Sequence, residues 1–474
     1  MSLEKRRSLH SRYKPQAEAD RYIDSLSLNE NLRYLVLVEP GLGYMIAPLR
    51  KKLPAAKIIS LHLEEAAAGP AADAGAPCQP PDSQWHPGTG ISVQDFLETE
   101  IPDSQAGEIL LLQWRPGMNV YGQSYVKLME EAVTFIKRAE AGARTVKAFG
   151  RRWFKNFFNN LALIRRALCP VQLSLPVLVC GSGPGLEEAI PLIKERRDGL
   201  FILAASSSLL ALEANGLGAD MLISTDGGGW ARFHLYAAFR GSAVCPIAAA
   251  ATALLPSQCE SLPLLMISDG SLWQALILQE MKIPFISLPQ RGTVSATAVD
   301  LAFALTSSQV FIAGIDLENK GIRSHARPYS FDRLLEEKEN RLNPFYSQTY
   351  LRSSVLKAGG SYGIYASWFE KQITSYPRPL YPLGKNNPLF GTGALPEWKK
   401  SIRPELKSIE IKYPAVPSAN PFPKAYSVLE QALKDPAHSP TLTAELSPLL
   451  SAKAASGDEL LHIIRSFNLG GSVG

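Results

Sequence analysis

The sequence has few cysteines and none in the arrangement that binds a metal. Its 474 residues include 5 cysteines, which are Cys78, Cys169, Cys180, Cys245 and Cys259. They do not show the short paired spacing of a zinc site or a redox pair. We therefore expect buried thiols in a reducing compartment and no bound metal.

The sequence also lacks a strong charge excess and a long hydrophobic run. Its formal net charge is +5, from 49 Lys and Arg against 44 Asp and Glu, and no tail or stripe concentrates the excess. This argues against a nucleic-acid partner. No stretch approaches the ~20 continuous apolar residues of a membrane helix, and residues 1–14 lack the apolar core of a signal peptide. We expect a cytoplasmic protein with no membrane partner, and its oligomeric state stays open.

A chain of 474 residues, of which 46% are hydrophobic, is too long to fold around a single small core. We expect an α/β fold in four parts. A Rossmann-like N-terminal domain over 1–120 is followed by a helical connector over 121–172. A central domain with a mostly parallel sheet spans 173–395, and a small helical C-terminal region spans 396–474.

The N-terminal part has the order of a βαβ unit. An apolar strand at 34–38 is followed by a glycine turn, a helix at 45–52 and a second strand at 57–63. Residues 66–90, rich in Ala, Pro and Gly, predict an inserted loop. The glycine turn after the first strand resembles that of methyltransferase-like folds, but no single carboxylate stands out after the second strand. We expect a structural or acceptor-docking domain.

Short apolar runs alternate with helical segments in the central part, as in a parallel α/β sheet. Amphipathic spacing predicts helices over 125–139 and 152–168 before this domain, and over 425–433 and 458–467 after it. The expected strands of the central domain are 177–180, 200–204, 221–224, 264–267, 285–288 and 310–313.

A glycine-rich loop follows the first central strand and is a candidate anion site. It consists of Gly181, Ser182, Gly183, Pro184 and Gly185. Backbone amides in such a loop can approach a phosphate closely. Leu186 stands where a dinucleotide-binding loop has its third glycine, so a standard NAD site is not expected. Pro191 predicts that the next helix begins several residues later. A tight turn without a ligand remains an alternative.

Two further strand ends carry polar residues. Ser206, Ser207 and Ser208 follow the second central strand, where hydroxyls could hold a base or ribose, or could only cap a helix. Asp226 follows the strand at 221–224 and is a plausible ligand contact. Ligands of parallel sheets bind at this edge.

The last cluster combines small hydroxyl residues with a histidine. Thr293, Ser295 and Thr297 begin a predicted helix, whose N-terminus could approach an anionic donor. Gly314 and Asp316 follow the strand at 310–313, and His325 comes shortly after. Because imidazole titrates near neutral pH, His325 is the best candidate for a general base.

Four segments in this order resemble the central domain of the motility accessory factor family: 181–187, 216–226, 292–302 and 314–317 with Ser324-His325-Ala326. Three segments before them, at 9–15, 41–44 and 153–156, resemble the region that precedes this domain in the family. The resemblance covers most of residues 8–390. Members of this family are thought to attach nonulosonic, sialic-acid-like sugars to flagellin.

The glycine loop and the unit ending in Gly314-Ile315-Asp316 also resemble bacterial sialyltransferases that use CMP-sugars. The resemblance implies an inverting, metal-independent transfer without a cofactor. The donor is a CMP-activated nonulosonic acid, and the acceptor is Ser or Thr of flagellin. In this interpretation the loop holds the CMP phosphate and His325 deprotonates the acceptor hydroxyl.

Two departures from the family pattern leave other functions open. Gly185 replaces a serine that usually follows Gly-Pro, and the stretch 381–387 differs from the family's Asn-Ala-x-Glu-Gly-Gly pattern. The chain could instead be a non-catalytic flagellin-binding accessory protein. The central domain also resembles archaeal hydroxymethyl-dihydropterin pyrophosphokinases, which transfer a pyrophosphoryl group from Mg-ATP.

Overall fold

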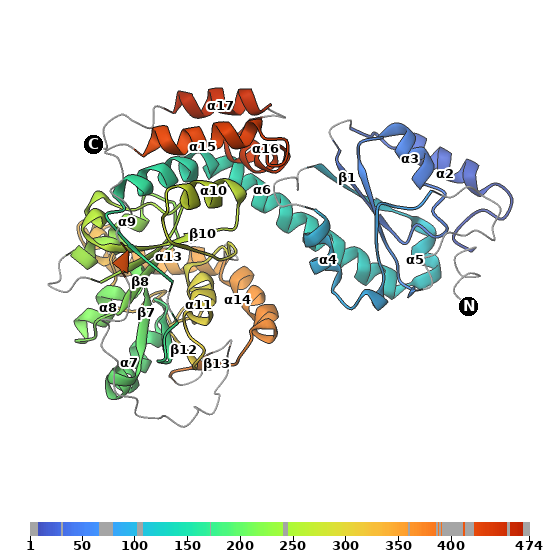
Figure 1. Ribbon diagram of the computed structural model, residues 1–474. Helices are drawn as coiled ribbons and strands as arrows, with labels where there is room; N and C mark the ends of the chain where they lie inside the picture. The colour runs from blue at the N-terminus through green and yellow to red at the C-terminus, as the bar shows by residue number, and fades with distance from the viewer. Residues whose placement is uncertain are drawn as a thin grey trace. The chain divides into compact units, whose positions relative to one another are not determined.

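The computed structural model divides into two compact units, which we describe separately (Figure 1). The first comprises Met1–Gly150 with Ser447–Lys453, and the second comprises Arg151–Leu446 with Ala454–Gly474. The sequence places the first boundary after residue 120, whereas this division falls at Gly150. The structure describes residues 8–29, 32–65, 79–101, 108–170, 172–239, 245–358, 361–384, 387, 390, 411–412, 421–452 and 456–467.

A four-stranded parallel sheet with the order β3-β2-β1-β4 forms the first unit. All five residues of β1 are buried, as expected for a central strand covered on both faces. The Rossmann-like prediction is confirmed. The strands are β1 (Tyr34–Val38), β2 (Lys57–Leu61), β3 (Ser83–Trp85) and β4 (Ile109–Gln113), and the helices before the long α6 are α2 (Pro15–Asp24), α3 (Ile46–Lys52), α4 (Val93–Glu100) and α5 (Arg115–Tyr121).

The predicted loop over 66–90 is wrong in its last part, because β3 pairs there with β2 in parallel. Trp85 lies opposite Leu61, and its ring packs partly buried against the core of this unit. The alternation of Ser83, Gln84 and Trp85 was too short to stand out among the neighbouring prolines and glycines. Residues 66–78 lie outside the described residues.

The second unit contains a ten-stranded, mostly parallel sheet with the order β13-β12-β6-β7-β8-β9-β10-β5-β14, in which β11 also pairs with β10. Of the neighbouring pairs, only β14 with β5 is antiparallel. The mostly parallel sheet is therefore confirmed. The strands are β5 (Arg166–Leu168), β6 (Val177–Cys180), β7 (Phe201–Ala205), β8 (Met221–Ser224), β9 (Ile247–Ala250), β10 (Pro263–Ser268), β11 (Phe285–Ser287), β12 (Val310–Ala313), β13 (Leu380–Pro382) and β14 (Ile411–Lys412).

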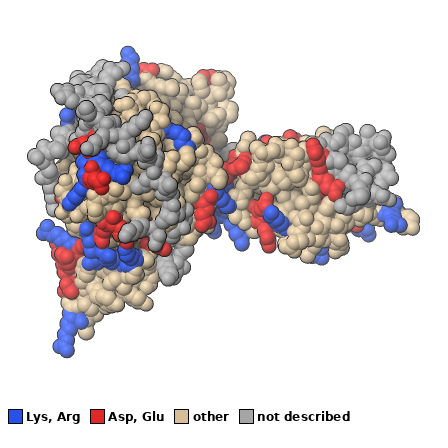
Figure 2. Space-filling view, turned by 90° about the horizontal axis from the view of Figure 1, so that it is seen from below, with Lys and Arg blue, Asp and Glu red and all other residues tan. Residues whose placement is uncertain are grey.

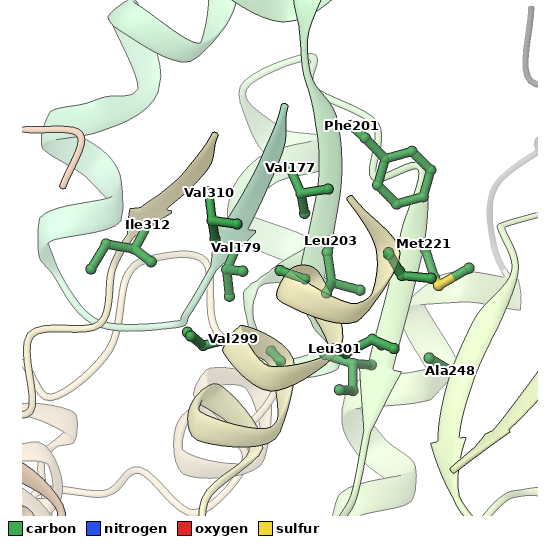
Figure 3. Close-up of a cluster of buried hydrophobic side chains, with 14 of the residues drawn as sticks. Val177, Val179, Phe201, Leu203, Met221, Ala248, Val299, Leu301, Val310 and Ile312 are labelled. Atoms are coloured by element: carbon green, nitrogen blue, oxygen red, sulfur yellow. The ribbon is translucent and has the colours of Figure 1, made fainter. Parts of the chain in front are cut away.

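Helices cover this sheet, and one of them supplies much of its core. α11 (Val294–Leu305) packs on β6, β7, β8 and β12. Figure 3 shows Val299 and Leu301 of this helix among side chains of the sheet such as Val179, Leu203 and Val310. The other helices before the C-terminal region are α7 (Gly185–Arg196), α8 (Leu209–Ala214), α9 (Ala231–Leu235), α10 (Leu272–Glu280), α12 (Asp332–Glu336), α13 (Phe345–Ala358) and α14 (Ser361–Gln372).

A single helix, α6 (Gln123–Leu163), replaces the two helices predicted over 125–139 and 152–168. Its last predicted residues instead form β5, which pairs with β10. The helix crosses the division between the two units at Gly150. The predicted connector over 121–172 is therefore mostly one helix of 41 residues.

The C-terminal region contains three helices in its described part: α15 (Phe422–Lys434), α16 (Ser439–Leu449) and α17 (Gly457–Ser466). The sequence predicts the first and the third. α17 begins with a capping box in which Ser456 and Glu459 satisfy each other's backbone amides. The predicted disordered end at 470–474 lies outside the described residues.

Charged side chains of both signs are interspersed on the face that Figure 2 shows. No helix in the described part of the chain is long and apolar enough to span a bilayer. The four described cysteines are free thiols. Cys180 and Cys259 are buried as predicted, whereas Cys169 and Cys245 are only partly buried, and Cys78 lies outside the described residues.

Candidate functional site

The strand order places a topological switch point between β6 and β12. From β6 the chain proceeds through β7 to β10 on one side, and α11 then returns it to β12 on the other side of β6. In open α/β sheets, ligands bind at such a point, outside the carboxyl ends of the strands. The two loops that leave this edge are 181–185 and 314–317. Both contain predicted site residues, so the structure brings them together.

These two loops touch each other through backbone atoms. The Gly181 amide donates to the Ala313 carbonyl (2.8 Å), and the Gly183 amide donates to the Gly314 carbonyl (2.8 Å). A side chain on Gly181 would collide with the Gly314 carbonyl, and Gly314 itself has a φ of 66°. Glycine is therefore required at both positions by the close approach of the two strand ends.

Asp316 binds the end of the glycine loop. Its Oδ2 accepts a hydrogen bond from the Gly185 amide (2.6 Å), which lies in the first turn of α7. A carboxylate is favourable there because the helix dipole is positive at this end. Burial nevertheless raises the pKa of Asp316, and Glu318 and Glu188 add to this effect.

The same carboxylate accounts for the glycine at position 185. A Cβ at this position would collide with both oxygens of Asp316. The serine of the family pattern would not fit here without moving Asp316. The prediction that α7 begins late is wrong, because the helix starts at Gly185 and contains Pro191 in its interior.

The segment that carries His325 is hydrogen-bonded to the glycine loop and to α7. The Ala326 amide donates to the Ser182 carbonyl (2.8 Å). Glu187 of α7 accepts hydrogen bonds from the Arg323 guanidinium (2.9 Å to Oε2) and from the Arg327 amide (2.9 Å). These bonds lie on both sides of His325, so the histidine is held beside the glycine loop.

Two neighbours orient the His325 ring. Its Nδ1 lies 2.8 Å from the Ser324 hydroxyl, and the ring stacks on Tyr329 with centroids 4.0 Å apart. His325 is half-buried, and Ser324 is buried. The contact with Ser324 involves Nδ1, one of the two ring nitrogens whose roles set the tautomer of a histidine.

A small cavity opens at His325 and contains two arginines that the sequence reasoning missed. Arg323 is tied to Glu187, and Arg327 lies over the Phe345 ring and 3.8 Å from Asp332. Guanidinium groups bind carboxylates and phosphates through paired donors. The cavity is lined by Arg323, Ser324, His325, Arg327, Tyr329, Asp332, Leu335 and Thr349.

Aromatic rings continue from this cavity toward the end of β8. Phe331 contacts Tyr329 (5.5 Å between centroids) and His234 (4.8 Å). Trp230 contacts Phe331 at 5.9 Å and is 63% exposed. An exposed indole beside a polar cavity offers a flat face to a ring-shaped ligand.

The other predicted residues lie along the same edge, where the structure gives them local roles. Asp226 is exposed and accepts from the Gly228 amide (2.7 Å). Ser206 and Ser207 form a short 3-10 turn after β7, in which Ser206 is buried and Ser207 partly exposed. The third serine, Ser208, is buried and donates to the Ala205 carbonyl (2.8 Å).

The threonine hydroxyls at the start of α11 form hydrogen bonds within the first turn of the helix. Thr293 caps the helix by accepting from the Ala296 amide (3.1 Å), and Thr297 donates to the Thr293 carbonyl (3.3 Å). Ser295 is partly exposed in the first turn. A ligand role for these residues stays a prediction.

Among the described residues, no group of three or more His, Cys, Asp or Glu side chains is placed to hold a metal ion. Three carboxylates at the switch point have protein partners. Asp316 binds Gly185, Glu187 binds Arg323, and Glu188 forms an ion pair with Lys320.

Residues 152–321 match the model of a family described as 6-hydroxymethylpterin diphosphokinase MptE-like. An uncharacterized protein of Treponema pallidum (strain Nichols) is 28% identical over 285 residues, or 59% of this chain and 61% of that protein. The chain thus spans about three fifths of that relative's length.

A solved structure of a MAf glycosyltransferase from Magnetospirillum magneticum AMB-1 is also similar. It matches with 14% identity and a TM-score of 0.42, over 65% of this chain and 56% of that one. Every predicted nucleotide-sugar residue lies inside the range 152–321 that matches the MptE-like family model, and His325 lies just beyond it.

Proposed function

We propose that this chain is a glycosyltransferase that moves a nonulosonic sugar from a CMP-activated donor to Ser or Thr of flagellin. The observation that carries the proposal is the placement of His325. The histidine is held beside the glycine loop at the switch point, in a cavity that also contains Arg323 and Arg327. A base and two fixed cations are the groups that this transfer needs.

Each group has a defined task in the proposed reaction. His325 accepts the proton of the acceptor hydroxyl while its oxygen attacks the anomeric carbon of the sugar. The bond from that carbon to the phosphate oxygen breaks, and CMP leaves with the bonding electrons. Attack from the face opposite to CMP inverts the anomeric centre. Arg323 and Arg327 offer charge to the sugar carboxylate or to the departing phosphate.

The partners of the edge carboxylates support a monophosphate leaving group. A Mg-ATP site needs carboxylate oxygens for the cation. Here Asp316, Glu187 and Glu188 are each engaged by a protein donor. The proposed transfer requires no metal and no cofactor besides the donor substrate, and it takes place in the cytoplasm.

The test is the intact mass of flagellin from cells that carry His325→Ala. Loss of a general base lowers the rate by about 10²–10⁴, so flagellin should lose the mass of the added sugar. His462→Ala, on the exposed face of α17, is the matched control and should leave the flagellin mass unchanged. Fully modified flagellin in the His325→Ala cells would contradict the catalytic role.

The MptE-like match favours a second candidate, a Mg-ATP-dependent hydroxymethylpterin pyrophosphokinase. It uses the same edge of the sheet, so the two candidates differ in ligands rather than in location. A non-catalytic flagellin-binding role predicts that flagellin keeps its mass when His325 is replaced.

A further inference from the structure

The turn after β1 in the first unit combines backbone strain with buried polar side chains. The turn runs from Glu39 to Gly43, and Glu39, Gly41 and Gly43 all have positive φ, at 45°, 63° and 80°. A positive φ is costly for glutamate, and such strain persists where the surroundings hold it in place. The turn lies at the carboxyl end of a central parallel strand, where ligands of such sheets bind.

Glu39 is fully buried at this edge and only partly satisfied. Its Oε2 accepts from the Leu63 amide (2.7 Å) at the end of β2. Its Oε1 has no hydrogen-bond partner among the described residues, and His62 Nδ1 faces it at 3.6 Å, which is too long for a hydrogen bond. His62 is 4% exposed, and its Nδ1 also lacks a partner there.

His10 lies on the other side of the turn. Its Nε2 accepts from the Leu42 amide (2.9 Å), and the ring occupies the space that a side chain on Gly41 would fill. Burial lowers the pKa of His10 to about 4, against the opposing effect of the Glu39 charge. The neutral ring therefore carries its proton on Nδ1, a buried donor without an acceptor in the described part of the chain.

Among the described residues, three buried polar atoms around this turn thus have no hydrogen-bond partner: Glu39 Oε1, His62 Nδ1 and His10 Nδ1. A buried polar group without a hydrogen-bond partner destabilises the folded chain unless a ligand or water satisfies it. The three atoms offer two ring nitrogens and one acidic acceptor within a single small region.

We propose that this edge of the first unit binds the ribose of a nucleoside, and that His10 occupies the site in its absence. Vicinal hydroxyls both donate and accept, so one can donate to Glu39 Oε1 while another accepts from His62 or His10. When His10 withdraws, the Leu42 amide becomes available to the ligand. The segment around His10 is held by Leu9, which is buried and accepts from the Trp114 indole (2.9 Å).

The test measures binding of adenosine, guanosine and uridine to the full chain by calorimetry, and cytidine is left out because the proposed transfer places it at the switch point of the second unit. We expect at least one nucleoside to bind, at least tenfold more weakly to Glu39→Gln and severalfold more tightly to His10→Ala. Glu39→Gln is nearly isosteric and keeps an acceptor for the Leu63 amide, so it should fold even if His10→Ala does not. Circular dichroism checks both variants.

His325→Ala serves as the control, because it alters the second unit and should leave this binding unchanged. The outcome is thus separate from the proposed transfer, which the flagellin mass tests. The proposal is overturned if no nucleoside binds either the native chain or folded His10→Ala. It is equally overturned if binding survives Glu39→Gln at full strength, since the ligand would then lie elsewhere.

Discussion

At the scale of single residues, Asp316 and position 185 depend on each other. The carboxylate fills the space beside Gly185 and accepts from its amide. We predict that Gly185→Ser lowers the free energy of unfolding by about 1–3 kcal/mol, because the added atoms force Asp316 out of place. Urea denaturation followed by circular dichroism measures the change.

The cause can be isolated with a second substitution. In an Asp316→Ala background the serine meets no carboxylate, so its cost should fall by at least half. Gly218→Ser is the matched control, since nothing lies within reach of a side chain there. An equal cost of Gly185→Ser in both backgrounds would show that Asp316 is not the reason for the glycine.

The candidate base was predictable from sequence, whereas the residues that hold it were not. Gly314 and Asp316 follow a predicted strand and His325 comes shortly after them, so this pattern is visible in the sequence alone. Glu187 lies in a helix more than a hundred residues earlier, and only the folded chain brings it to Arg323 and Arg327. In the sequence, Glu187 is an acidic residue in the first turn of α7, which is a common feature of ordinary helices and does not indicate this role.

At the scale of elements, continuous apolar strands were predictable and helix limits were less so. β1, β6, β8 and β12 have the predicted bounds, because their buried runs are short and uninterrupted. β9 was missed because alanines form most of it, and alanine does not favour strands.

α6 is continuous where the sequence predicts two helices. Gly142 and Gly150 lie between the two predicted segments, and the helix continues through both. A side chain on Gly142 would meet open space, whereas one on Gly150 would collide with the backbone of Leu449. Gly150 therefore allows α16 to approach closely, a long-range reason that local propensity cannot reveal.

Two asparagines of α6 hold the loops that follow β8 and β9. Asn156 donates to the carbonyls of Gly227 and Thr252, and Asn160 donates to those of Ala251 and Ala253. Both side chains are buried. We predict that Asn160→Ala lowers the free energy of unfolding by about 2 kcal/mol, because it leaves two buried carbonyls without donors.

Asn159 gives the comparison for this prediction, since it precedes Asn160 on the same helix and is exposed. Asn159→Ala should change the stability by less than about 0.5 kcal/mol. Urea unfolding of both variants would decide. Similar losses for the two would mean that helix propensity, rather than the loop contacts, sets the cost.

At the scale of the whole molecule, two lines of evidence about the central domain point to different substrates. The segments at 181–187 and 314–317 resemble CMP-sugar transferases, whereas the family match over 152–321 is to a pterin diphosphokinase-like domain. Under either proposal an anionic nucleotide binds at the switch point. The ion pairs of Glu187 and Glu188 favour a nucleotide that needs no cation from the protein's carboxylates.

Ligand-dependent melting of the full chain separates these substrates. A ligand present at a hundred times its Kd adds about 2.7 kcal/mol to the stability of the unit that binds it. We predict that CMP raises the melting temperature by about 5 °C, at about 2 °C per kcal/mol for a unit of this size. Cytidine, which lacks the phosphate, should raise it less, and Mg-ATP with hydroxymethylpterin should leave it unchanged.

His325→Ala should keep the response to CMP, because the histidine acts on the acceptor rather than on the nucleotide. A response to Mg-ATP and pterin but not to CMP would assign the switch point to pyrophosphoryl transfer and overturn the glycosyltransferase proposal.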